Sequence, residues 1–514
     1  MKRIYNTFIY ITIVSFFASC NAFLDVTPVD KVLEDDQFST EIGITGALNG
    51  IYRQMISSHL YGAQLSQTTV ETMGRVYTYS DVSPSAGFVY TEIYSLVNGD
   101  YANNGNVESR FANIWKTGYN TVYNMNHFLE SVEKSSAIIS PEHKELVMGE
   151  VYGMRAFLHF DIFRLFGPRY EERSDINKIL PYNRSTDVVL NHTGYEEDVY
   201  STAEEYMGFV LADITKAEQL LKSDPIRTDL SAVSNDLVSD IYKNRNRRMN
   251  YYAVKALKAR VLQYMGDIKN AAIAAKEVTD QVGDNKPFKW TNASNVVSKQ
   301  DFSFYKEVIF GIDSPDMQSN YNSFYTKKSL LDVYVVDRNH LIKNIYAGFG
   351  ENISTIIDVR SSQWVLSKST SSSSFSIDGA YLSNKFNMAD NTYIPALVNY
   401  QPLMRITEMY YIMAEAYLKE GNKTEAAKLL NMISEKRGIS DTNDYILSGD
   451  EEDQIFDSHI MTEYYKEFYG EGQVFFYHKR KKSTQMFKGN NEGMSDINVT
   501  KIYTVDIPKI ETNI

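Results

Sequence analysis

Side chains that could hold a ligand through stacked rings and hydrogen bonds gather in two parts of the chain. The sequence contains 38 Tyr and 26 Phe but only 3 Trp. A tyrosine ring has an apolar face and a polar edge, which suits the recognition of sugars or peptides as well as core packing. Packing is the alternative role for each candidate. The candidate ligand contacts are Arg75, Tyr77, Tyr79, Tyr90, Tyr94, Asn98, Tyr101, Trp290, Tyr321 and Trp364.

Catalytic chemistry finds little support in the sequence. It contains no nucleophile elbow, phosphate-binding loop, zinc-binding helix motif or Rossmann glycine pattern. A glycosidase carboxylate pair is defined only in three dimensions, so the sequence leaves that alternative open. Glu408, Glu415, Glu463 and Glu467 nevertheless lie on expected helices, where ion pairs are the commoner use of such residues. We therefore expect no enzyme, no cofactor and no bound metal.

Cys20 is the only cysteine in 514 residues. It follows two basic residues and an apolar run over 9–17, which is the layout of a secretory signal. The run Phe17-Ala18-Ser19-Cys20 resembles the lipobox of bacterial lipoproteins, in which the thiol accepts a diacylglyceryl group, although Phe17 stands where Leu is usual. A single cysteine in an exported protein has no disulfide partner. We expect Cys20 to carry lipid; a buried free thiol in a cytosolic protein is the alternative.

The elements that must position the candidate contacts are mostly helical. The strongest signal covers Leu403 to Gly438, where apolar residues recur at helical spacing. Glu420-Gly421-Asn422 interrupts the pattern, and a second helix is expected from about Thr424 to Gly438. Ser140-Pro141 is the favoured cap-then-proline start of another helix. Trp115 lies within a helical segment and is expected in the core.

The helix pair has a second copy upstream. Small and turn residues fall on the spacing of a tetratricopeptide motif in both copies, and two unrelated hairpins are the alternative. At a constant offset of 155 residues, Ala259, Leu262, Gly266, Asp267 and Ala271 precede Ala414, Tyr417, Gly421, Asn422 and Ala426. Helical repeats of this kind build concave scaffolds.

Composition divides the chain into a scaffold and an inserted part. Helical periodicity fades from 282 to 400, where Ser, Asn and Asp are frequent and the run Glu307–Ile312 is strand-like. Residues 62–105 are also loop-like in composition, and binding residues tend to lie on loops. We expect a signal peptide at 1–19, a lipidated extended leader at 20–38, an N-terminal helical scaffold with ligand-facing loops at 39–281, a loop-rich insertion at 282–400, and a C-terminal helical repeat and tail at 401–514.

The formal net charge of −13 bears on partners rather than on fold. An acidic surface is unfavourable for nucleic acid and for anionic lipid headgroups. We expect no nucleic-acid partner.

Several short motifs together resemble the SusD/RagB family of outer-membrane nutrient-binding lipoproteins. They are spread over nearly the whole chain, behind the lipobox. The matching residues are Phe23 to Pro28, Ala47 to Tyr52, Gly149-Glu150, Arg155-Ala156, Phe166-Gly167, Glu307 to Phe310, Asp358, Arg360, Arg405, Glu408 to Tyr410, Ile412, Ala414 to Ala416, Glu467, Glu471-Gly472, Ile507-Pro508 and Glu511. Two positions depart from the family pattern, since Tyr464 and Gln473 stand where many relatives have Arg.

The resemblance implies a mainly α fold, a SusD-like superhelix of tetratricopeptide-like repeats with a loop-rich insertion that contains short strands. It implies a non-catalytic lipoprotein, anchored in the outer membrane and facing the cell exterior, which delivers an oligosaccharide to a SusC-like TonB-dependent barrel. Two alternatives stay open: a peptide-binding RagB-like uptake protein, and an envelope scaffold that uses its repeats for protein assembly. The resemblance does not transfer the identity of the ligand.

Overall fold

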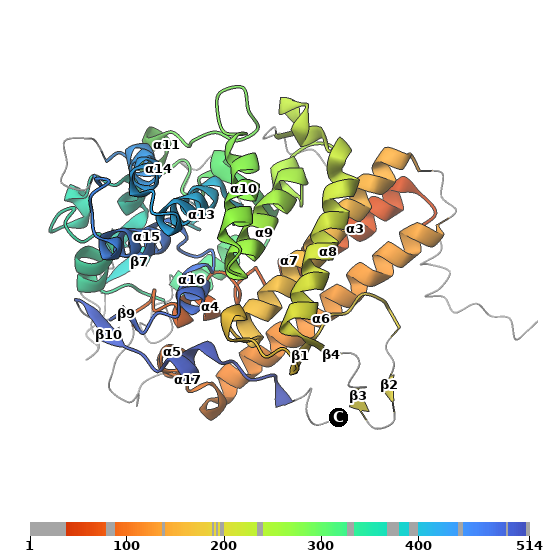
Figure 1. Ribbon diagram of the computed structural model, residues 1–514, viewed down its shortest axis with the longest axis horizontal. Helices are drawn as coiled ribbons and strands as arrows, with labels where there is room; N and C mark the ends of the chain where they lie inside the picture. Colours follow the sequence, from red (N-terminus) through yellow and green to blue (C-terminus); the bar gives the residue numbers. More distant parts are fainter. Residues whose placement is uncertain are drawn as a thin grey trace, which may run out of the picture.

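The computed structural model of the protein describes residues 37–78, 88–135, 139–187, 190–191, 194–195, 200–233, 240–325, 334–366, 380–389, 399–439, 446–489 and 492–509 (Figure 1). The predicted signal peptide, Cys20, nearly all of the predicted leader and Tyr79 lie outside the described residues. Within these ranges, no helix has both the length and the apolarity to cross a bilayer.

A stack of helices runs across the molecule, from α3 at one side to α14 at the other (Figure 1). Each helix of the stack packs against the next helix of the stack. The mainly helical fold that the sequence predicts is therefore confirmed. The stacked helices are α3 (Glu41–Met55), α6 (Gly105–Lys134), α7 (Pro141–Phe166), α8 (Ala203–Leu220), α9 (Tyr251–Tyr264), α10 (Ile268–Thr279), α13 (Ile406–Lys419) and α14 (Lys423–Lys436).

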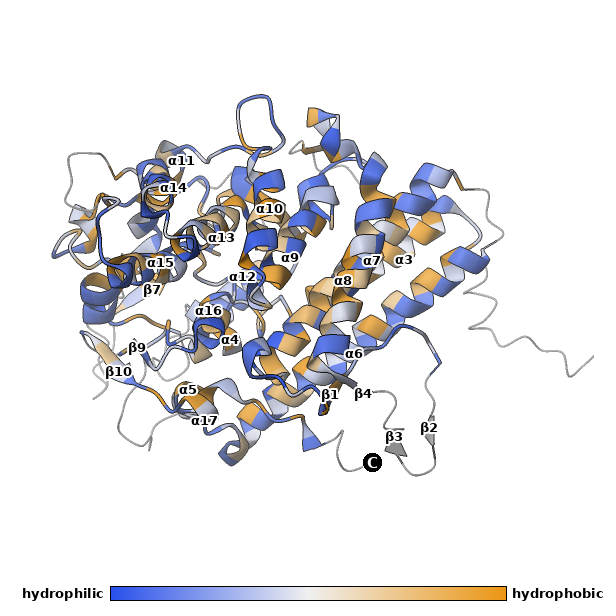
Figure 2. Cartoon of the chain, in the orientation of Figure 1, coloured by the Kyte–Doolittle hydropathy of each residue, from blue (hydrophilic) through white to orange (hydrophobic). Residues whose placement is uncertain are grey.

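Side-chain caps begin the long helices. Thr40, Asn104 and Ser140 accept backbone N–H bonds at the starts of α3, α6 and α7, and Pro141 follows Ser140 as predicted. Thr202 begins α8 with a reciprocal capping box. Figure 2 shows hydrophobic and hydrophilic residues on the same helices α3 and α6, as expected for helices that bury one side.

The hairpins α9–α10 and α13–α14 have the same turn. Gly266 and Gly421 follow the first helix of each hairpin with φ of +85° and +77°, a backbone conformation that strains other residues. Asp267 and Asn422 then cap the second helix by accepting a backbone N–H bond. Helix α10 packs against both α9 and α13, so the hairpins lie side by side. The 155-residue offset thus corresponds to matching turns and matching caps.

The chain leaves the stack after α10 and returns to it at α13. Strands β5 and β8 pair antiparallel near the two ends of this excursion, with Val308 opposite Arg405. The run predicted as strand-like, Glu307–Ile312, overlaps β5 with an offset of one residue. The elements of the excursion are α11 (Ala293–Val297), β5 (Val308–Asp313), α12 (Met317–Tyr325), a π-helix (His340–Ile345), β6 (Trp364–Leu366), β7 (Tyr381–Ser383) and β8 (Tyr400–Arg405).

The segment from 62 to 105, predicted to be loop-like, contains helices, so that prediction was wrong. Helix α5 buries Ile93, Leu96 and Val97 on one side, a pattern that the aromatic and Ser-rich composition obscured. The helices and paired strands not yet named are α4 (Thr69–Met73), α5 (Phe88–Asn98), α15 (Asp453–Glu467), α16 (Val474–Lys481), α17 (Val499–Tyr503), β1 (Lys178–Pro181) with β4 (Tyr200–Thr202), β2 (Leu190–Asn191) with β3 (Gly194–Tyr195), and β9 (Gln485–Phe487) with β10 (Met494–Asp496).

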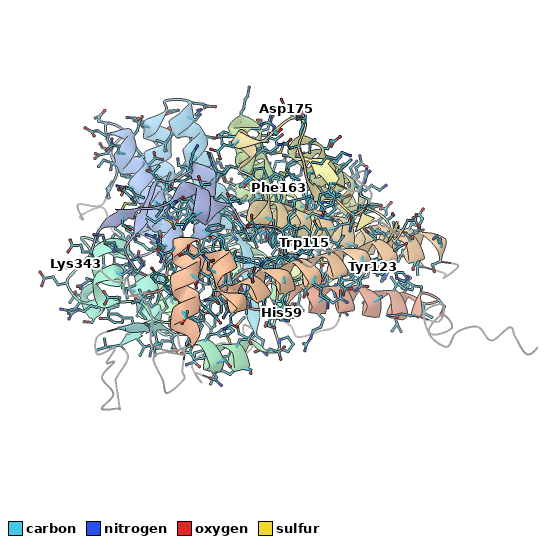
Figure 3. The ribbon with its side chains drawn as sticks, turned by 90° about the horizontal axis from the view of Figure 1, so that it is seen from below. His59, Trp115, Tyr123, Phe163, Asp175 and Lys343 are labelled. Atoms are coloured by element: carbon cyan, nitrogen blue, oxygen red, sulfur yellow. The ribbon has the colours of Figure 1, made fainter. Side chains whose placement is uncertain are left out.

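The largest hydrophobic cluster of the described chain follows the helical stack. Trp115 belongs to it and is only 3% exposed, which confirms its predicted place in the core (Figure 3). A second cluster brings together residues of α5, α12, the π-helix, α15 and β9. Because this second cluster contains three of the predicted ligand contacts, the candidate site is built around it.

Candidate ligand-binding site

Three predicted contact residues meet in one aromatic cluster. The Tyr77 ring lies 4.7 Å from the Tyr334 ring, and the Tyr77 hydroxyl lies 2.9 Å from that of Tyr325. The Trp364 ring lies 4.6 Å from Tyr469 in an edge-to-face contact. The tyrosine cluster, as we name it, consists of Tyr77, Tyr321, Tyr325, Tyr334, Trp364 and Tyr469.

The tyrosine cluster is buried, since none of its members is more than 6% exposed. Burial raises the pKa of Tyr321 to about 12 and raises that of Tyr77 and Tyr325 well above the usual value, so the hydroxyls stay protonated. The rings of Tyr77, Tyr321 and Trp364 are therefore not the open stacking platforms that the sequence analysis expected. One of them, Tyr321, contacts a more exposed polar surface through its hydroxyl.

That surface is a group of amides around the hydroxyl of Tyr321. Gln318 donates through Nε2 to Oδ1 of Asn322 at 3.0 Å and lies 3.5 Å from Oδ1 of Asn387. Asn384 Oδ1 accepts from Asn387 Nδ2 at 2.8 Å and from the Tyr321 hydroxyl at 3.2 Å. Within the described chain, the buried Oε1 of Gln318 has no hydrogen-bond partner. The amide patch, as we name it, consists of Gln318, Asn322, Asn384 and Asn387.

Helix α12 places amides and rings together because each type repeats at helical spacing. Tyr321 and Tyr325 are four residues apart and lie on the buried side of the helix. Gln318 and Asn322 are also four residues apart and lie on a more exposed side. The side chain of Asn320 donates to a backbone carbonyl in the turn after α3 at 3.0 Å, which fixes α12 to the scaffold.

Tyr321 was predicted from the sequence as a ligand contact, whereas the amides were not. The frequent Asn and Ser of 282–400 were the available signal, but two separate segments supply the patch. Asn384 and Asn387 follow β7, about sixty residues after α12, and no spacing in the sequence connects them with Gln318.

Two further candidates make hydrogen bonds to distant segments of the chain. Arg75 is 4% exposed and donates to Oγ of Ser495 on β10 at 2.8 Å. Tyr101 is 7% exposed and donates to the carbonyl of Ile502 on α17 at 2.7 Å. Both side chains are enclosed, so their contacts support the packing role that was the alternative.

The remaining candidates on this side of the molecule belong to α5. Tyr94 and Asn98 are partly exposed, and Asn98 Nδ2 donates to the Tyr94 carbonyl at 3.0 Å. The backbone of Tyr90 lies in the same helix. The ligand-binding roles of these three residues stay predictions.

Trp290 is not brought to the tyrosine cluster. It precedes α11, which lies at the edge of the molecule opposite α5 (Figure 1). Its partly buried ring stacks on Tyr410 of α13 at 5.4 Å, and the Arg437 guanidinium lies 5.6 Å from its centre. These contacts are with the helical scaffold.

A buried ion network joins the excursion to the scaffold beside the tyrosine cluster. It contains five cationic and five carboxylate side chains, and none of them is more than 5% exposed. Arg360 lies 2.8 Å from both Glu463 and Glu467, and Arg437 lies 2.6 Å from Glu307. The members are Glu307, Asp358, Arg360, Lys385, Arg405, Arg437, Glu463, Lys466, Glu467 and Glu471.

The network controls the ionisation of its carboxylates. Burial alone would raise the pKa of Glu467, but Arg437, Arg405 and Arg360 outweigh it and hold that pKa well below its usual range. Lys385 donates to Glu471 and to the carbonyl of Tyr469, both at 2.7 Å. The network therefore supports one wall of the tyrosine cluster directly.

Glu71 of α4 is buried beside the turn that contains Glu471 and Gly472. Its Oε1 accepts the N–H of Gly472 at 2.8 Å, while its buried Oε2 has no partner in the described chain. Burial raises the pKa of Glu71 to about 8, against the effect of that hydrogen bond. Gly472 has φ of +72°, and a Cβ there would collide with the carbonyl of Leu65, so this turn requires glycine.

The four glutamates considered as a glycosidase pair, Glu408, Glu415, Glu463 and Glu467, all form ion pairs. Glu408 pairs with Arg260 at 2.6 Å and Glu415 pairs with Arg480 at 2.7 Å, while the other two belong to the buried ion network. Within the described ranges, no three His, Cys, Asp or Glu side chains are grouped as a metal site.

A cavity of about 370 Å³ opens at the end of the molecule formed by α15, the π-helix and the β9–β10 hairpin. We name it the α15 cavity. It is lined by Lys343, Asn344, Ala347, Phe349, Ser434, Ser458, His459, Thr462, Glu463, Lys466, Phe487, Glu492 and Gly493.

Family models match two large parts of the chain. The model described as "SusD family" matches residues 354–507, and the model described as "Starch-binding associating with outer membrane" matches residues 22–262. The chain belongs to the SusD/RagB family. The resemblance based on short motifs is thereby confirmed.

Curated relatives and solved structures agree with this family. The SusD-like protein P38 of Formosa agariphila is 20% identical over 100% of this chain and 99% of its own. The match to SusD-like protein P25 of the same organism is 26% identical but spans 37% of this chain and 36% of that protein.

Solved structures show the same fold over nearly the whole chain. A SusD superfamily protein of Bacteroides thetaiotaomicron has a TM-score of 0.69 at 19% identity, covering 92% of this chain and 98% of its own. A SusD-like carbohydrate binding protein of Bacteroides vulgatus has a TM-score of 0.65 at 16% identity, covering 92% and 96%.

The buried ion network contains residues that carried the family resemblance. Asp358, Arg360, Arg405, Glu467 and Glu471 all carried the resemblance, and the structure places every one of them in this network. In this SusD/RagB protein the family pattern therefore includes residues that hold the fold together.

The two departures from the family pattern are accommodated by local contacts. Tyr464 packs against the ring of Tyr477 at 4.5 Å. Gln473 accepts a hydrogen bond from Arg164 at 3.1 Å. Arg480 pairs with Glu415 nearby, so the ionic contacts in this region are made from other positions.

Proposed function

We propose that this SusD/RagB protein captures an oligosaccharide at the outer membrane without cleaving it, and that the amide patch makes the main contacts. The family description associates starch binding with the outer membrane, and one structural neighbour is described as carbohydrate binding. The amide patch is the observation that carries the proposal for this chain.

The chemistry of the patch suits sugar hydroxyls. Each hydroxyl both donates and accepts, and an amide offers both functions in a planar group of fixed geometry. Gln318, Asn322 and Asn387 present such amides at partly or fully exposed positions, next to the buried ring of Tyr321 on the same helix as Gln318 and Asn322. A few fixed polar groups on an apolar floor are typical of small-ligand sites.

Delivery to a transporter is the second part of the proposal. The captured glycan would pass to a SusC-like TonB-dependent barrel, with the protein anchored through lipid on Cys20 and facing the cell exterior. The family description and the lone cysteine behind a signal-like run support this part. Labelling with a radioactive fatty acid tests the anchor, because wild type should incorporate label and Cys20→Ser should not.

Affinity electrophoresis tests glycan capture. A soluble form starting at Asn21 is run against a panel of plant, fungal and host polysaccharides, and the reaction is assayed for released reducing ends. Retardation by one glycan without release is the expected result and names the ligand class. Release of reducing ends would make the protein an enzyme, and retardation by none would contradict glycan capture.

A further inference from the structure

The α15 cavity is lined by none of the amide-patch residues and has walls that are fixed to one another. Asn344 of the π-helix accepts the N–H of Gly493 at 2.7 Å and donates toward the carbonyl of Lys488, which ties the π-helix to the β9–β10 hairpin. Helix α15 forms the third wall. Its Lys466 ammonium lies 4.5 Å from the centre of the Phe349 ring, which lines the same cavity. The cavity is therefore preformed.

The π-helix shapes one wall. The N–H of Tyr346 donates to the carbonyl of Leu341 at 2.9 Å, five residues earlier, and this wider turn directs Asn344 inward while Lys343 stays exposed. Figure 3 shows Lys343 at the end of the molecule opposite Tyr123. Single π-turns in proteins occur often at functional sites.

Polar groups in the lining have unused hydrogen-bonding capacity. His459 is partly buried, and its Nε2 is enclosed without a partner in the described chain. Lys466 is 5% exposed, and within the described chain its ammonium donates one side-chain hydrogen bond, to Glu463 at 3.1 Å, although an ammonium has three N–H groups. Exposed Ser458 and partly exposed Thr462 add hydroxyls at the rim. Buried groups of this kind require a partner.

The lining has balanced charge and two aromatic rings. Lys343 and Lys466 are matched by Glu463 and Glu492, and burial lowers the pKa of His459 to about 4, so its imidazole is neutral at pH 7. Phe349 and Phe487 supply apolar faces beside the polar groups. A neutral ligand with apolar C–H faces and many hydroxyls matches this combination.

We propose that the α15 cavity is a second carbohydrate site, which takes one neutral pyranose unit. Its volume of about 370 Å³ falls within the range of small-molecule sites, about 300–1,000 Å³. His459 and Lys466 hydrogen-bond the sugar hydroxyls, and the phenylalanine rings contact its C–H face. This proposal rests on carbohydrate as the ligand class of the proposed function but assigns a separate place to it.

Saturation-transfer NMR on the soluble mature protein tests the second site with the methyl glycosides of glucose, galactose, mannose and xylose. Ser458→Trp fills the rim of the cavity from an exposed position on α15. Its matched control is Gln454→Trp, one turn earlier on the same helix, also exposed and outside the lining. We expect at least one glycoside to bind wild type and Gln454→Trp equally, and to bind Ser458→Trp at least tenfold more weakly.

A second variant guards against a folding defect in the first. His459→Ala removes the unpartnered ring without adding bulk, and we expect it to weaken the same glycoside at least fivefold while circular dichroism stays unchanged. Equal binding by wild type, Ser458→Trp and His459→Ala would overturn the second site. So would the absence of any glycoside signal from wild type.

Comparison with the gel assay separates the two proposals. If a polysaccharide retards wild type and the glycoside experiment fails, glycan capture stands and the α15 cavity is excluded as a sugar site. If no polysaccharide retards the protein and no glycoside binds, both proposals are wrong.

Discussion

The buried ion network and the surface around the tyrosine cluster are adjacent, yet they satisfy their polar groups differently. In the network, every one of the ten charged side chains has an opposite charge within 3.1 Å. Around the tyrosine cluster, Oε1 of Gln67, Oε2 of Glu71 and Oε1 of Gln318 are buried without a partner in the described chain. In the first region every charge is paired, while in the second some buried polar atoms have no hydrogen-bond partner in the described chain.

The largest expected effect comes from removing one cation of the network. Arg360→Met leaves Asp358, Glu463 and Glu467 buried with reduced compensation, and we expect the free energy of unfolding to fall by about 3–5 kcal/mol. Urea denaturation of the soluble protein measures this change. The matched control is Lys276→Met, which breaks an exposed pair with Asp280 and should cost less than about 0.5 kcal/mol.

The stability of the protein at acid pH should depend on the same network. Because the folded-state pKa of Glu467 is lowered, its contribution to stability is complete above the unfolded pKa of about 4.3 and is lost as the pH falls further. The loss of stability between pH 5 and pH 3 should therefore be smaller in Arg360→Met than in wild type. Parallel pH profiles for the two proteins would show that the network does not control this ionisation.

A smaller effect is expected at the two tryptophans that the sequence analysis treated alike. Trp364 is 6% exposed against Tyr469, so Trp364→Ala should lower the free energy of unfolding by about 3 kcal/mol. Trp290 is partly buried on Tyr410, and Trp290→Ala should cost less than half as much. Thermal unfolding and glycan retardation are measured on both variants. Loss of retardation by Trp290→Ala at unchanged stability would restore Trp290 as a ligand platform.

The scaffold was predictable because its signals are local. Gly266 with Asp267 and Gly421 with Asn422 mark turns and caps within a few residues, and the fold places them in equivalent hairpins. The ligand side was not predictable in the same way. Asn387 reaches the amide patch from a segment distant in sequence, and the burial of Tyr77 depends on rings from α12 and on Tyr469. Composition alone does not distinguish a buried tyrosine cluster from a tyrosine platform.

The unpartnered carboxylate of Glu71 can be tested through the pH dependence of the free energy of unfolding. Its folded-state pKa of about 8 lies above the unfolded value of about 4.3, so its contribution to stability is complete below pH 4 and is lost as the pH rises toward 8. Glu71→Gln keeps an acceptor for the Gly472 N–H and removes the titration. We expect the variant to be more stable than wild type by about 1–3 kcal/mol at pH 8, and equal to it at pH 4. A difference independent of pH would mean that Glu71 does not titrate in this range.

The smallest effect concerns binding alone. Asn387→Ala removes one amide from the patch at a partly exposed position, and we expect the affinity for the retarding glycan to fall about fivefold to tenfold, or about 1 kcal/mol. The free energy of unfolding should change by less than about 0.5 kcal/mol. Gln300→Ala removes an exposed amide elsewhere in the excursion and should leave both quantities unchanged. If Asn387→Ala lowered stability without weakening the glycan, the amide patch would belong with the ion network as part of the fold, and the distinction between the two regions would be lost.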